Sequence, residues 1–133
     1  MPREKAKLTL KELDRALEKA WSRATSADPN NWTRENPAWG QCAVTACVVQ
    51  DYFDGKLLRV NAFAPEIVDP IGHYFNDLPD GTMPDLTRKQ FPAGTMFSKP
   101  EERTREYVLD PKFTTKKRYK LLKRRLRTCL NAQ

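Results

Sequence analysis

NPAWGQCAVTACVVQDYF, residues 36–53, passes from a loop into an almost uniformly apolar segment. Proline and glycine in its first five residues disfavour a helix there. Residues 41–53 are apolar on nearly every side, with small alanines among them, and Asp54-Gly55 then suits a helix C-cap. Because a helix that is apolar on all sides is buried, we predict a central helix over residues 41–53. A strand over residues 44–49 is the alternative, since periodicity does not separate the two in so short a run.

Local patterns on either side of this helix indicate the remaining elements. Thr9 and Glu12 have the spacing of a capping box, and the apolar residues that follow recur at helical intervals. Asp80-Gly81 separates two runs in the way that is typical of a hairpin turn. We predict a helix over about 9–24, a strand over 57–63, a hairpin of 73–78 with 82–87, a short helix near 100–109 and a last helix over about 114–130. This order is that of an α+β fold, with the central helix packed on a small antiparallel sheet.

Length, charge and cysteine content limit the class of protein. The chain has 133 residues, a formal net charge of +7 and 3 cysteines. This length fits one domain over residues 1–133, with a core over about 9–110 and a basic C-terminal helix over about 111–133. No apolar run is long enough to cross a bilayer and no leader segment is recognisable, so we expect a cytoplasmic protein without membrane contact. In that compartment the cysteines are expected to be free thiols.

The positive charge is concentrated near the C-terminus. Residues 112–127 hold nine basic residues and no acidic one, so the rest of the chain sums to −2. One interpretation is a solvated helix face, which suits the negative end of the helix dipole. The other is weak contact with nucleic acid or an acidic partner, although no base-reading motif accompanies the basic residues. That contact would use Lys116, Lys117, Arg118, Lys120, Lys123, Arg124, Arg125 and Arg127.

Cys42 opens the predicted central helix, where unpaired N–H groups favour a thiolate. The one histidine, His73, falls in the predicted hairpin. If the hairpin loop has three or five residues, Phe75 lies opposite Asp85, and His73 shares a face with Asp85 within side-chain reach. A loop of two or four residues would instead leave His73 without a carboxylate. Pro79 and Pro84 disfavour a tight two-residue hairpin. We therefore predict the register with a loop of three or five residues, which places His73 near Asp85.

Cys42, His73 and Asp85 in that register form a candidate catalytic triad. Cys42 would attack an amide or (thio)ester carbonyl, His73 would transfer the proton, and Asp85 would fix the imidazole tautomer. The backbone N–H of Cys42 and the side chain of Gln41 are the available oxyanion donors. A nucleophile at the start of a central helix, with a later base from a sheet, is the chain order of papain-like thiol enzymes of the NlpC kind.

Structural interpretations stand beside each of these roles. Cys42 as a small core residue, His73 as a satisfied core histidine and Asp85 as a turn cap are each as compatible with the sequence. Cys42 and Cys47 lie on different sides of a helix, so we predict neither a metal site nor a cofactor. The alternative to a hydrolase is a non-catalytic binding module that uses the same cleft or the basic helix.

Several joined motifs resemble the YunG family of small bacterial proteins. They are residues 36–46, 49–52, 73–81 and 85–91. The resemblance spans about Trp32 to Phe91, leaves the basic C-terminal helix outside, and implies a bacterial or phage-borne cytosolic domain. Its characteristic polar positions here are Gln41, Cys42, His73, Asn76 and Asp85, and Phe75 stands where relatives are expected to carry tryptophan. The resemblance supplies no reaction.

Three further residues are candidates for binding. Trp32 and Trp39 are expected to hold the loop before Cys42 in place, and Asn76 belongs to the polar set of the family.

Overall fold

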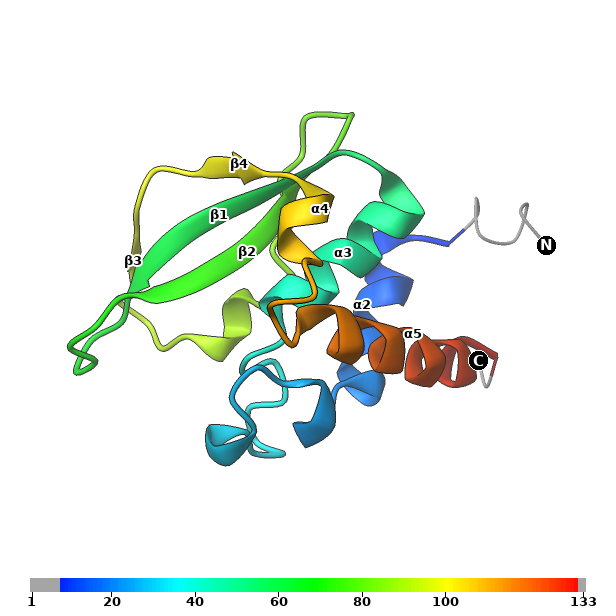
Figure 1. Ribbon diagram of the computed structural model, residues 1–133, viewed down its shortest axis with the longest axis horizontal. Coiled ribbons are helices and arrows are strands. Elements are labelled where there is room, and N and C mark those ends of the chain that lie inside the picture. The colour runs from blue at the N-terminus through cyan, green and yellow to red at the C-terminus, as the bar shows by residue number, and fades with distance from the viewer. Residues whose placement is uncertain (1–7, 132–133) are drawn as a thin grey trace.

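A computed structural model describes residues 8–131, with a small sheet on one side and three longer helices on the other (Figure 1). The elements are α2 (Leu10–Ala20), α3 (Cys42–Phe53), β1 (Lys56–Phe63), β2 (Ile71–Asp77), β3 (Met96–Phe97), β4 (Glu101–Arg103), α4 (Arg105–Val108), α5 (Thr115–Asn131) and short 3-10 helices at Arg23–Thr25, Pro29–Asn31 and Arg88–Gln90. The α+β architecture predicted from the sequence is confirmed. The predicted domain limits at residues 1 and 133 lie outside the described residues.

The sheet has four strands, all antiparallel, with β1 in the middle. β2 pairs along one side of β1, whereas β3 and β4 follow one another along the other side. Val60 lies opposite His73 and Leu57 lies opposite Asn76, so these two pairs face opposite sides of the sheet. Leu57 belongs to the main core with the helices, and Asn76 contacts α3. His73 therefore lies on the face away from the centre of α3.

The hairpin predicted over 73–78 and 82–87 is only partly formed. β2 takes its strand partner from β1, and residues 82–87 are not a strand. Two hydrogen bonds remain, from Leu78 N–H to the Thr82 carbonyl at 2.8 Å and from Asn76 N–H to the Pro84 carbonyl at 3.2 Å. Pro84 has no N–H to return, which limits the ladder. The two bonds still enclose a three-residue loop. This loop length gives the predicted register, in which Asp85 lies opposite Phe75 of β2.

α2 begins as the capping box predicts and ends earlier than predicted. The Thr9 hydroxyl accepts from the N–H of Glu12 at 3.1 Å, and the Glu12 carboxylate accepts from the N–H of Thr9 at 2.9 Å. The helix ends at Ala20 and not near residue 24. Ser22 N–H donates to the Thr25 hydroxyl at 2.9 Å and starts a 3-10 turn, which competes with a further α-helical turn.

α3 is the central buried element, so the alternative strand over residues 44–49 is wrong. Every residue from Val44 to Val49 is buried, and α3 packs against β2 and α5. The Thr45 hydroxyl accepts from the Trp21 indole N–H at 2.9 Å, which satisfies a polar group inside the core.

α5 packs on α2 and α3 and shares their core. Tyr119, Leu122 and Leu126 are buried, as the predicted apolar face requires. On α3, Asp51 accepts from Arg105 at 2.7 Å and from the Tyr119 hydroxyl, which joins α3, α4 and α5. The C-terminal helix is therefore integral to the packing. Within residues 8–131, no helix combines the length and the hydropathy needed to cross a membrane.

Candidate functional site

The loop before Cys42 is fixed by its own side chains. Gly40 has φ 75°, and a Cβ there would come within 2.2 Å of the Ser26 hydroxyl oxygen, so only glycine fits. The Trp39 indole donates to Asp28 at 3.0 Å, and the Trp32 indole donates to the Pro37 carbonyl at 3.0 Å. Trp32 and Trp39, which are also candidates for binding, thus use their indole N–H groups to hold this loop in place.

Cys42 is the first residue of α3 and is partly exposed. The first N–H groups of a helix have no partner inside it, so the positive end of the helix dipole lies at this thiol. The thiol lies 3.9 Å from the carbonyl oxygen of Gly72, the residue before His73. The start of α3 and the start of β2 thus meet at the sulfur atom.

His73 is fully buried, and only one of its two ring nitrogens has a hydrogen-bond partner among the described residues. Its Nε2 lies 2.7 Å from Oδ2 of Asp85, as the predicted register requires, and its ring packs among Phe75, Phe91 and Phe97. Its Nδ1 is buried without a hydrogen-bond partner among the described residues. Nearly all buried polar groups in proteins are paired, so an unpaired imidazole nitrogen requires a functional or structural reason.

The surroundings of His73 favour its protonated form. Burial alone lowers the pKa of His73, but the hydrogen bond to Asp85 and the proximity of the Cys42 thiol outweigh it and raise the pKa to about 9. This shift favours the imidazolium form of His73 at neutral pH. Because Nε2 faces Asp85, the second proton of the imidazolium resides on Nδ1, the ring nitrogen away from Asp85.

Two predicted polar residues brace α3 from inside the protein. Gln41 is fully buried, and its amide accepts from the Thr25 hydroxyl at 2.8 Å and donates to the Ser22 carbonyl at 2.9 Å. Asn76 is also buried and donates to the Ala46 carbonyl at 2.9 Å. Both amides are therefore buried and engaged inside the protein.

Arg118 is the residue whose position differs most from its predicted role. The sequence predicts that Arg118 contacts an outside partner, but its side chain is buried and donates to the Thr25 carbonyl at 3.0 Å. Burial lowers the pKa of Arg118, and the nearby Cys42 thiol opposes that shift. A sequence signal existed: Arg118 precedes Leu122 by four residues and so lies on the buried face of the helix.

A small pocket of about 140 Å³ opens beside Asp85. Its lining is mostly apolar: Val60, Phe75, Met83, Asp85, Arg88, Phe97, Ser98 and Pro100. Within residues 8–131, no group of three or more His, Cys, Asp or Glu side chains is arranged to hold a metal ion.

Comparison with known proteins places the chain in a family. The family model described as "YunG protein" matches residues 9–131. The chain is similar to "Uncharacterized protein YunG" of Bacillus subtilis (strain 168), with 35% identity over 94 residues, which is 71% of this chain and 73% of that protein. No solved structure matches the chain. The family match includes α5, so the expectation that the basic helix lies outside it is wrong. The chain belongs to the YunG family.

Proposed function

We propose that this protein is a cysteine hydrolase of papain-like layout that cleaves an amide or (thio)ester bond. Cys42 is the nucleophile, His73 is the acid and base, and Asp85 is the positioning residue that holds the imidazole. The observation that carries the proposal is the unpaired, buried Nδ1 of His73, whose opposite nitrogen is held by Asp85 at 2.7 Å. The Cys42 thiol is close enough to raise the pKa of the same ring.

The proposed reaction has two steps, acylation of Cys42 and hydrolysis of the resulting thioester, and His73 gives up one proton in the first and regains one in the second. The Cys42 thiolate attacks the carbonyl carbon, and the imidazolium of His73 gives its Nδ1 proton to the leaving amine, alcohol or thiol. A thioester joins the acyl group to Cys42. Water then attacks this thioester, His73 accepts a proton from the water, and the acid product leaves as the Cys42 thiolate returns beside the imidazolium.

Three features of the fold support these steps. Negative charge on the carbonyl oxygen would develop near the first N–H groups of α3, which have no helical partners. The mostly apolar pocket lined by Asp85 offers an acyl or leaving group a place beside the carboxylate that holds His73. The aromatic rings around His73 keep its imidazole out of water, which strengthens the hydrogen bond that the ring makes to Asp85.

The proposal predicts that p-nitrophenyl acetate acylates one particular cysteine. We expect a burst of p-nitrophenolate close to one equivalent of protein, with the acetyl group mapped to Cys42 by peptide mass spectrometry. Cys42→Ala should remove the burst. Cys129→Ala is the matched control, because Cys129 is also a partly exposed thiol on a helix, and it should leave the burst unchanged.

The opposite pattern would support the non-catalytic binding module. A burst that survives Cys42→Ala, or acetyl groups spread evenly over lysines and Cys129, would show that Cys42 has no special reactivity.

A further inference from the structure

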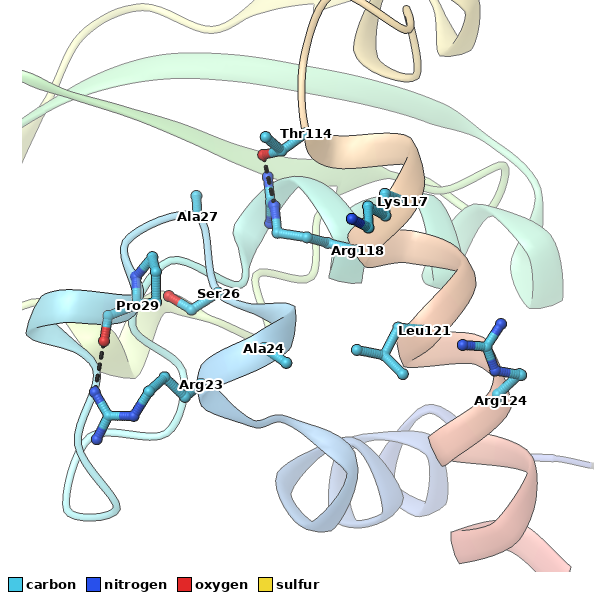
Figure 2. Close-up of a pocket in the computed structure, with 10 residues that line it drawn as sticks. All are labelled: Arg23, Ala24, Ser26, Ala27, Pro29, Thr114, Lys117, Arg118, Leu121 and Arg124. Carbon is cyan, nitrogen blue, oxygen red and sulfur yellow. Dashed lines mark hydrogen bonds between the residues drawn. The ribbon is translucent and has the colours of Figure 1, made fainter.

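A pocket of about 710 Å³ lies between α5 and the segment that follows α2, apart from the pocket beside Asp85 (Figure 2). Its lining includes four basic side chains, Arg23, Lys117, Arg118 and Arg124, and no acidic one. Leu121 and Ala24 add apolar surface. The pocket thus combines positive charge with a small apolar patch, which is the lining expected for an organic anion.

Arg118 is a buried cation without a carboxylate partner among the described residues. Its three nitrogens donate to Thr25, Thr114 and Thr115, all through neutral oxygen atoms. No carboxylate of residues 8–131 forms an ion pair with it. A guanidinium has five N–H groups, so these three bonds leave donors to spare.

The protein pairs another partly buried arginine in the ordinary way. Arg105 meets the carboxylate of Asp51 at 2.7 Å. Burying an arginine without a carboxylate costs free energy, because the ion loses water and gains no opposite charge. A bound anion would offset that cost at Arg118, whereas Arg105 needs none.

Figure 2 shows how the basic side chains are arranged around the pocket. Lys117, Arg118 and Arg124 all come from α5, and Leu121 extends from the same helix toward the opposite wall. Arg23 lies on that opposite wall, where its guanidinium donates to the Pro29 carbonyl at 2.6 Å and points away from α5. Most of the positive charge in the lining of the pocket therefore comes from α5.

We propose that this pocket binds a small ligand through an anionic group, either a phosphate or a carboxylate. Arg118 contacts the anion from the floor, and Lys117 and Arg124 complete the charge from the rim. The proposal does not depend on the chemistry of Cys42. The pocket is nevertheless connected to that residue, because Arg118 donates to the Thr25 carbonyl and the Thr25 hydroxyl donates to Gln41, the neighbour of Cys42.

Isothermal titration calorimetry at low salt tests this site with two probes, pyrophosphate and citrate. We expect at least one to bind, and the better of the two identifies the preferred anion. Lys117→Gln and Arg124→Gln should each weaken binding by about fivefold to tenfold, because each removes one charged contact. Lys120→Gln is the matched control: Lys120 is exposed on α5 outside the pocket, so its loss should change the Kd by less than about twofold.

Two results would overturn the proposal. One is the absence of binding by either probe. The other is equal weakening by Lys120→Gln and the pocket variants, which would mean that the basic face of α5 attracts anions diffusely. Cys42→Ser should bind as the parent does, so failure of the hydrolase proposal would leave this result unaffected.

Discussion

Replacing His73 with glutamine should slow the alkylation of Cys42 by chloroacetamide at neutral pH by about tenfold to a hundredfold. The thiolate is the reactive form of cysteine, and the positive charge of the imidazolium favours it. Glutamine keeps a polar side chain of similar size but carries no charge. Peptide mass spectrometry of samples quenched over time gives the rate for each cysteine separately.

The other two cysteines are controls within the same sample. Cys129 is partly exposed and reports any general change in thiol reactivity. Cys47 is buried, and burial raises its pKa to about 12, so it becomes alkylated only when the fold opens. Equal slowing of Cys42 and Cys129, or an unchanged rate at Cys42, would refute the coupling of Cys42 to His73. Rapid alkylation of Cys47 would identify unfolding, in which case Asp85→Asn replaces His73→Gln and should slow Cys42 in the same direction.

Leu122→Ala should lower the free energy of unfolding by about 2–5 kcal/mol. Leu122 is fully buried in the core that α5 shares with α2 and α3, and truncation leaves a cavity between these helices. Urea denaturation followed by tryptophan fluorescence measures the change. Leu121→Ala is the matched control, because Leu121 is only half-buried on the same helix and should cost less than about 1.5 kcal/mol. Similar small losses for both variants would contradict the integral position of α5.

The helices could be predicted from the sequence because their signals are local. The capping box of Thr9 and Glu12 and the apolar run after Gln41 do not depend on distant residues. β3 and β4 were missed because segments of two and three residues carry no periodic pattern. Their places are set by pairing with β1, which is a long-range contact.

The candidate site likewise contains one contact that the sequence predicts and several buried residues that it does not. The contact between His73 and Asp85 was predicted because the prolines of the hairpin limit its register, and register decides which side chains share a face. The burial of Gln41, Asn76 and Arg118 depends on how α3, β2 and α5 meet. A single sequence does not specify those contacts. Polar residues that stabilise the core therefore could not be distinguished from polar residues that face a ligand.

The titration of His73 tests the central claim, that Cys42, His73 and Asp85 form one coupled group. His73 is the only histidine in the chain, so its imidazole signals in a ¹H–¹⁵N spectrum need no further assignment. We expect a pKa of about 9 in the parent protein, and a lower pKa in Cys42→Ser because the thiol contributes to the shift. A midpoint at or below the ordinary pKa of 6.5, unchanged by Cys42→Ser, would contradict the coupling.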